Sequence, residues 1–156
     1  MHVRFAVLLT LALAALPAAG QIAIPISGSS TQNFDGIGTS ATATLSASWK
    51  ADKQSAARTL GTFSAAVTAT ERQGGANLSS AASNGIYNFG SGTTTTGPDR
   101  AIGFLSSSGG TQSGNLYAQL QNNSGTALTG LTITYDVEKY RNGSNAAGFR
   151  FQMFYS

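Results

Sequence analysis

The sequence predicts a secreted all-β protein, an antiparallel β-sandwich that is jelly-roll-like and follows a signal peptide. Three observations predict it: apolar and polar residues alternate along short segments, Gly, Asn and Ser clusters separate those segments, and no window repeats apolar residues at helical spacing. Alternation with one polar face indicates antiparallel sheets that are wetted on one side. Short strands with turn signals at this spacing are typical of sandwiches and jelly rolls.

Residues 1–20 have the pattern of a signal peptide. Arg4 precedes an apolar run over residues 5–16, and a stretch of small residues follows before Gln21. The run is about twelve residues long, whereas a membrane-spanning helix needs roughly twenty. We therefore expect a cleaved signal rather than an anchor, a mature chain that begins at Gln21, and secretion. A cut after Ala19 is a close alternative.

The chain that follows the signal is predicted to hold one domain. Removing 20 residues from 156 leaves 136, which is enough for one core and too few for two comfortable ones. Residues 21–30 contain Pro25 and a stretch of Ser and Gly, so we expect a flexible lead-in there and a single β-sandwich domain over 31–156. No later stretch reaches membrane-spanning length, so we expect no membrane contact after cleavage.

The charge of the chain is low and mildly basic. There are 9 Lys and Arg residues against 6 Asp and Glu, and Arg4 leaves with the signal, so the net charge is about +2. No run of basic residues is present, which argues against nucleic acid as a partner. Uncharged polar residues take the place of charge, a composition that suits an extracellular β domain.

The residues of the commonest catalytic sites are missing. Cysteine is absent, and the one histidine, His2, lies in the predicted signal. The secreted chain therefore lacks the side chains of Ser-His-Asp and Cys-His catalysis, and of zinc sites built from thiolates or imidazoles. Two carboxylates would suffice for a glycosidase, but nothing in the sequence places two acids in one cleft. We expect a protein that is not an enzyme.

Five weaker strands and one short helical segment are also expected. The helical segment is residues 50–60, which could form one or two turns. Weaker alternation predicts short strands at 41–45, 58–63, 65–70, 85–89 and 100–105.

The clearest strand is predicted over residues 128–139. Leu131, Ile133, Tyr135 and Val137 alternate there with polar residues, which places the apolar groups on one face. A strand over 115–121 precedes it, and the turn residues 122–125 join the two, so a hairpin is expected.

The last segment, residues 149–155, repeats this pattern after turn residues at 142–145. Phe149, Phe151, Met153 and Tyr155 share one face. The chain stops directly afterwards at Ser156. Two interpretations stay open: this strand completes the domain, or the domain is truncated and a further strand belongs to a longer protein.

Two acids on the strand at 128–139 are candidate ligands of a cation. Asp136 and Glu138 share one face and could coordinate Ca²⁺ together, but that ion takes six to eight oxygens. Asp35 or Asp99 would have to join them. The alternative is that Glu138 pairs with Arg141 or a base on a neighbouring strand and orients the following turn. We therefore expect no cofactor, with a structural Ca²⁺ as the open alternative.

Aromatic residues are candidates for ligand binding because flat rings stack on sugars. Trp49, Tyr140 and Arg141 are the candidate ligand-binding residues, and Trp49, between Ser48 and Lys50, is expected to be partly exposed. A domain of this size also needs aromatic residues in its core, so a packing role is the competing interpretation for each ring.

Four segments together resemble a known module: residues 31–38, 84–90, 99–105 and 131–143, the last with a Tyr-x-x-Glu-x-aromatic-Arg stretch at 135–141. They resemble an uncharacterised β-sandwich module near the N-terminus of secreted proteins from environmental bacteria, often upstream of adhesion repeats, nuclease domains or sorting anchors. The resemblance implies location and architecture but no activity. Related modules continue past the strand at 149–155, and this chain does not.

The expected function is a non-catalytic structural or adhesive role at the cell surface or in the matrix. Extracellular polysaccharide or other surface proteins are the expected partners. One alternative is a carbohydrate-binding module, which predicts an exposed aromatic pair beside amide side chains. The other alternative is the leader domain of a larger secreted enzyme.

Overall fold

The structure is a computed structural model that describes residues 20–25, 27–76, 78–92, 97–141 and 148–156. Residues 1–19 of the predicted signal peptide lie outside the described residues, as do residues 142–145 of the second predicted turn. In the described part of the chain, no helix is long and apolar enough to cross a membrane.

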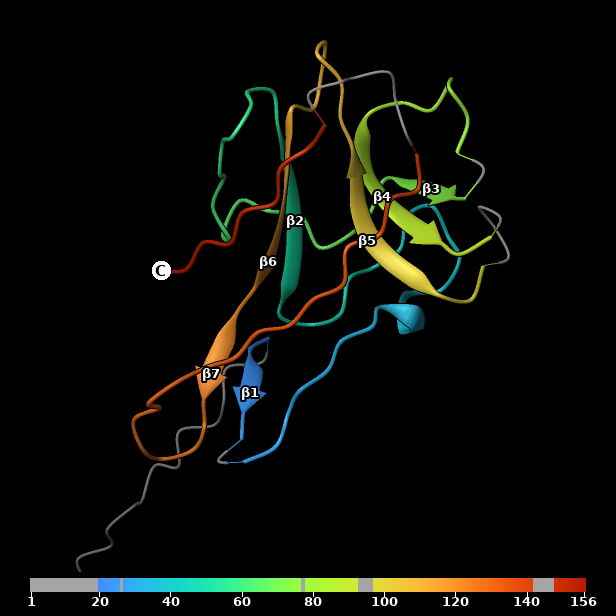
Figure 1. The fold of residues 1–156 in the computed structure, drawn as a ribbon. Helices are drawn as coiled ribbons and strands as arrows, with labels where there is room; N and C mark the ends of the chain where they lie inside the picture. Colours follow the sequence, from blue (N-terminus) through green and yellow to red (C-terminus); the bar gives the residue numbers. More distant parts are fainter. Residues whose placement is uncertain (1–19, 26, 77, 93–96, 142–147) are drawn as a thin grey trace, which may run out of the picture.

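Among the regular elements of the described residues, strands predominate, so the chain is all-β, and the one helical element is a single 3₁₀ turn, η1 (Asp35–Ile37) (Figure 1). The strands are β1 (Ile22–Ile24), β2 (Trp49–Gln54), β3 (Arg72–Gly75), β4 (Gly85–Gly90), β5 (Arg100–Leu105), β6 (Ser113–Ala118) and β7 (Leu120–Asn122).

The strands form three small sheets of mixed orientation. β2 pairs antiparallel with β6, and β4 pairs antiparallel with β5, but β3 runs parallel to β4 and β1 runs parallel to β7. The prediction of purely antiparallel sheets is therefore wrong. Residues 76–84 carry the chain from the end of β3 back to the start of β4, so the two strands run in the same direction.

The strands predicted at 85–89 and 100–105 are confirmed as β4 and β5, and 115–121 corresponds to β6 and β7. The prediction of helical turns at 50–60 is wrong, because residues 50–54 belong to strand β2, in which Ala51 is fully buried between the half-buried Lys50 and Asp52. The predicted lead-in at 21–30 contains β1, in which Ile22 and Ile24 are half-buried beside β7. In β1 the two isoleucines share one face of the strand and Ala23 is exposed on the other.

Three of the weaker predicted strands do not form full ladders. Segments 41–45 and 65–70 contribute only isolated bridges, Thr44 to Ala69 and Val67 to Ala51. Segment 58–63 forms no strand, since Arg58 has a φ of 59°, which lies in the left-handed region and interrupts an extended ladder.

The strongest strand predictions, 128–139 and 149–155, are wrong, because both segments lie outside any ladder. The predicted hairpin is wrong as well. The Gln119 N–H donates to the Ser48 carbonyl and the Asn123 N–H to the Ile24 carbonyl, so the chain on both sides of β7 bonds to partners other than 128–139. Alternation marks a face that can be buried, whereas a ladder also needs a partner edge.

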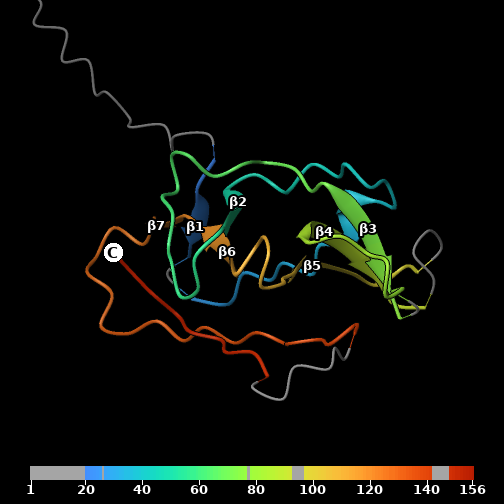
Figure 2. The same cartoon turned by 90° about the horizontal axis from the view of Figure 1, so that it is seen from above.

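The core lies between the β2–β6 pair and the β3–β4–β5 sheet. Leu45, Ala51 and Ile86 are buried at its centre. Trp49, Ile102 and Phe104 pack around them. The two C-terminal segments run along one side of these strands (Figure 2). The core therefore belongs to residues 43–118, and the C-terminal segments add little to it.

Candidate functional site

Three polar residues tie the loop after η1 to the β4–β5 sheet. The Asn88 side chain is fully buried, and its Nδ2 donates to the Gly38 carbonyl at 2.8 Å and to the Ser40 carbonyl at 2.9 Å. Arg100 Nε donates to Gly38 at 3.0 Å, and the Arg100 backbone N–H donates to Asp35 Oδ1 at 2.9 Å. We call Asp35, Asn88 and Arg100 the loop clamp. Asn88 and Arg100, two of the most buried polar side chains, thus attach the loop after η1 to the sheet.

The loop clamp also positions the ring that covers Trp49. Phe34 precedes η1 and has a φ of 62°, which turns the chain sharply there. Its ring meets Trp49 edge-to-face, with the centroids 5.0 Å apart. Trp49 is half-buried and packs against the core, as an amphipathic ring at the edge of a sheet does. The structure thus places this candidate ligand-binding residue between Phe34 and the core.

Three aromatic rings stack on the opposite face of β4. The centre of the Phe89 ring lies 5.0 Å from that of Tyr87 and 4.5 Å from that of Tyr140, and the ring planes are tilted by 12° and 9°. Gly74 and Gly103 leave room for the Phe89 ring, since a Cβ on either would lie 2.3 Å and 2.6 Å from it. We call Tyr87, Phe89 and Tyr140 the aromatic stack. Offset stacking of this kind stabilises a structure beyond the burial of area.

Tyr140 holds residues 128–141 against the β3–β4–β5 sheet through its contact with Phe89. Its hydroxyl donates to the Glu138 carboxylate, and burial, followed by this hydrogen bond and the Glu138 charge, raises the pKa of Tyr140 above its ordinary value. Arg141 donates instead to the Ser80 carbonyl, at 3.5 Å. The predicted pairing of Glu138 with Arg141 is therefore wrong, because each has a different partner.

The residues present do not fit a calcium site at Asp136 and Glu138. Within the described residues, no three His, Cys, Asp or Glu side chains lie close enough together to hold a metal ion. Asp35 accepts the Arg100 backbone N–H and an Asn33 amide instead of joining these two acids. Two carboxylates supply too few of the six to eight oxygens that Ca²⁺ prefers.

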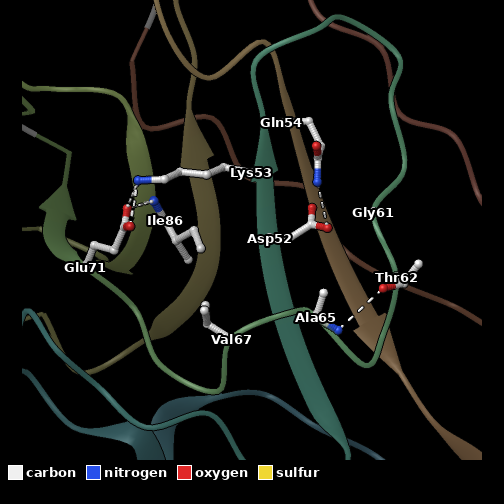
Figure 3. Close-up of a pocket in the computed structure, with 9 residues that line it drawn as sticks. All are labelled: Asp52, Lys53, Gln54, Gly61, Thr62, Ala65, Val67, Glu71 and Ile86. Atoms are coloured by element: carbon white, nitrogen blue, oxygen red, sulfur yellow. Dashed lines mark hydrogen bonds and ion pairs between the residues drawn. The ribbon is translucent and has the colours of Figure 1, made fainter.

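A cleft of about 250 Å³ lies between β2 and β4 (Figure 3). Its lining residues are Asp52, Lys53, Gln54, Gly61, Thr62, Ala65, Val67, Glu71 and Ile86. Lys53 Nζ lies 2.6 Å from Glu71 Oε1 and 2.8 Å from Oε2, and the Ile86 N–H donates to Glu71 at 3.1 Å. Burial raises the pKa of Glu71, but these hydrogen bonds and the charges of Lys53 and Arg72 outweigh it and lower the pKa below 4.5.

Asp52, on the other wall of the cleft, is surrounded by donors. It accepts from Asn115 Nδ2 at 2.6 Å, from the Tyr117 hydroxyl at 2.8 Å and from Gln54 Nε2 at 3.2 Å. Burial, followed by the hydrogen bond to Asp52 and its charge, raises the pKa of Tyr117 to about 12. We call Asp52, Gln54, Asn115 and Tyr117 the polar cluster.

The two acids of this cleft do not converge on a common point. Neighbouring residues of a strand project to opposite faces, and Figure 3 shows Asp52 and Gln54 on one side of β2 and Lys53 reaching to Glu71 on the other. Each carboxylate is already engaged by donors of the chain itself. This arrangement joins strands and gives no acid-and-base pair.

The polar cluster was missed from the sequence, although a signal for it exists. Asp52 lies opposite Asn115, and Lys50 opposite Tyr117, in the β2–β6 register. Recognition of residues 49–54 as a strand would have placed these polar residues on facing strands. The Ala, Gln and Arg residues of segment 50–60 indicate helical turns instead.

Apolar side chains are exposed along residues 128–141 and 148–156, which we call the C-terminal segments. On the first segment the exposed residues are Leu128, Leu131, Ile133, Tyr135 and Val137, with exposed fractions of 40%, 52%, 50%, 58% and 45%. On the second they are Phe149 (62%), Phe151 (59%), Met153 (52%), Phe154 (53%) and Tyr155 (100%). Lys139 Nζ lies 5.7 Å from the centre of the Phe149 ring, so the two segments touch there. Apolar surface of this extent marks an interaction site in most proteins.

Comparisons with protein-family models, with curated proteins and with solved structures returned no match to this chain.

Proposed function

We propose that the chain is a secreted, non-catalytic β-sandwich module with a structural or adhesive role at the cell surface or in the matrix. The observation that carries this proposal is the exposure of alternate apolar residues along the C-terminal segments. Exposed apolar surface favours contact with another surface, because water is released when the two meet. A mildly charged chain does not repel such a surface strongly.

The internal use of the polar side chains supports a non-catalytic role. The loop clamp joins a loop to β4 and β5, the polar cluster joins β2 to β6, and the Lys53–Glu71 pair joins β2 to the chain before β3. In the described residues, each of these groups makes hydrogen bonds to other parts of the chain. Side chains held in this way stabilise a framework.

The sandwich architecture and secretion are parts of the same proposal. The β2–β6 pair and the β3–β4–β5 sheet contribute Ala51, Ile86 and Phe104 to one shared core, which supports two packed layers. The signal-like residues 1–20 support export.

A carbohydrate-binding module is the second candidate, favoured by an exposed aromatic pair, Phe149 and Phe151, with the amide residue Gln152 next to Phe151 in the sequence. Their rings are 86° apart, however, so they form no common flat platform. The coplanar aromatic stack has Tyr87 and Phe89 buried. This geometry places carbohydrate binding second.

The test measures retention of the secreted chain on alkyl-coated beads and on polysaccharide beads. A double variant, Ile133→Asn with Phe151→Asn, removes apolar groups from both C-terminal segments. The matched control, Thr134→Asn with Gln152→Asn, changes the neighbouring positions, which project to the other side of an extended chain.

The proposal predicts that the wild type and the control are retained on alkyl beads equally and that the first variant is retained several-fold less. Retention in high salt should persist, because apolar contacts are not screened. Equal retention of all three proteins on alkyl beads would contradict the adhesive role. Retention on polysaccharide beads alone, released by soluble oligosaccharide, would favour the second candidate.

A further inference from the structure

The segment 148–156 has no hydrogen bond to another described part of the chain, unlike the segment 128–141, which Tyr140 and Arg141 hold against the sheet. Its backbone donors and acceptors are therefore available for a strand partner. An extended segment with unpaired backbone groups and apolar side chains is a template for β-pairing with another chain.

The exposed area of this segment is of the size that protein interfaces bury. From the exposed fractions of Phe149, Phe151, Phe154 and Tyr155, and about 150–250 Å² for each aromatic side chain, the rings expose roughly 400–700 Å². The largest patch on a typical monomer is about 300–600 Å², and each partner of a standard interface buries about 800 Å². Met153 and the backbone supply part of the remainder.

The sequence of the segment is complementary to itself in an antiparallel register. When two copies align about Gln152, Phe149 lies opposite Tyr155, and Phe151 lies opposite Met153. The only charged side chain, Arg150, then lies opposite Phe154, where a guanidinium can contact an aromatic face. No like charges meet, and every apolar residue except Phe154 lies opposite an apolar or aromatic partner.

We propose that residues 149–155 pair antiparallel with the same residues of a second copy of this chain, which gives a two-fold symmetric dimer centred on Gln152. The inference rests on the proposed function, since it names the first partner of an apolar segment that mediates contact. A symmetric pair closes on itself, because the same patch serves both copies. The pairing brings the exposed rings of the two copies together and satisfies the backbone groups on the facing edge of each segment.

The test uses charge at the symmetry centre of the full secreted chain. Gln152→Glu and Gln152→Lys each place two like charges opposite one another in the dimer, and like charges directly opposite destabilise a strand pair. Sedimentation velocity from low micromolar to several hundred micromolar protein should show the wild type as a dimer at high concentration. Each variant alone should dimerise at least tenfold more weakly, and an equal mixture of the two should recover dimerisation.

Cross-linking provides a second readout. The chain contains no cysteine, so Gln152→Cys should give a disulfide-linked dimer on oxidation, because directly opposite residues lie at a separation a disulfide can bridge. Thr134→Cys, on the other segment, is the matched control and should cross-link far less. Equal cross-linking of the two would contradict the register.

The outcomes separate this inference from the proposed function. A wild type that stays monomeric at every concentration but is retained on alkyl beads overturns the dimer and leaves the adhesive role standing. A chain that neither dimerises nor binds the beads overturns both. Dimerisation that is unchanged in both charge variants overturns the Gln152 register. The circular dichroism of each variant, together with the emission of Trp49 in the core, verifies its fold.

Discussion

Replacement of Asn88 by alanine should release the loop that the loop clamp holds. The side chain is fully buried, and it donates two hydrogen bonds to carbonyls 48 and 50 residues away along the chain. Asn88→Ala removes both bonds, so the Gly38 and Ser40 carbonyls each lose one hydrogen-bond donor in a site that excludes water. The loop from 35 to 40 then loses its attachment to β4.

The expected cost follows from these contacts. Two hydrogen bonds at about 0.5–1.5 kcal/mol each give about 1–3 kcal/mol, and the space left by the amide adds to this, so the free energy of unfolding should fall by about 2–4 kcal/mol. That is a large part of the roughly 5–15 kcal/mol that stabilises most domains. Asn84→Ala is the matched control, because its amide makes only a 3.4 Å contact with Ser107.

Urea unfolding followed by Trp49 fluorescence measures both effects at once. Trp49 is the single tryptophan of the chain, and the loop places Phe34 against it. The Asn88→Ala protein should have a lower midpoint and a red-shifted native emission, while the Asn84→Ala protein should change by less than about 0.5 kcal/mol. A loss below about 0.5 kcal/mol in Asn88→Ala, with unchanged emission, would refute the clamp.

Three further predictions concern the aromatic stack, the polar cluster and the ion pair. Gly103→Ala should destabilise the protein by about 1–3 kcal/mol in thermal melts, because the new Cβ would lie 2.6 Å from Phe89; Gly109→Ala, with nothing within 4 Å, should not. The pKa of Tyr117 is raised to about 12, so its stabilisation is present below pH 10 and is lost as the pH rises toward 12. Ultraviolet titration should therefore lose one late-titrating tyrosine in Tyr117→Phe. The lowered pKa of Glu71 stabilises the fold above the ordinary pKa of 4.5, and this stabilisation is lost as the pH falls through the lowered pKa of the folded state. The loss of unfolding free energy between pH 6 and pH 3, measured by urea unfolding, should therefore be larger in the wild type than in Lys53→Met. Because the Lys53–Glu71 pair is exposed, the excess should be less than about 1 kcal/mol.

The sequence predicted the fold well where a segment has both the pattern of a strand and a partner strand close by in the chain. β4 and β5 are apolar, bounded by turn residues and adjacent in the chain, so each finds its partner nearby. The strand at 128–139 shows better alternation than either, yet it forms no ladder. Period-two alternation reports that one face can be buried, but it does not name the edge to which a strand bonds.

The site was harder to predict because its contacts join residues far apart in the chain. The three residues of the loop clamp come from segments 31–38, 84–90 and 99–105, which carried the resemblance, and Tyr140 comes from the fourth segment, 131–143. The sequence marked those segments without indicating that they meet around β4. Ring chemistry alone points to Trp49 and Tyr140 in the sequence, whereas the structure places Phe34 against the first ring and Phe89 against the second.

Hydrogen–deuterium exchange of the dilute chain tests the central claim that the C-terminal segments are available for contact. Amides in 148–156 should exchange within the shortest labelling times, because no described part of the chain accepts their hydrogen bonds, whereas amides of β4 should be protected strongly. Protection of 148–156 comparable to that of β4 in the monomer would contradict the account, since it would make this segment an ordinary core strand.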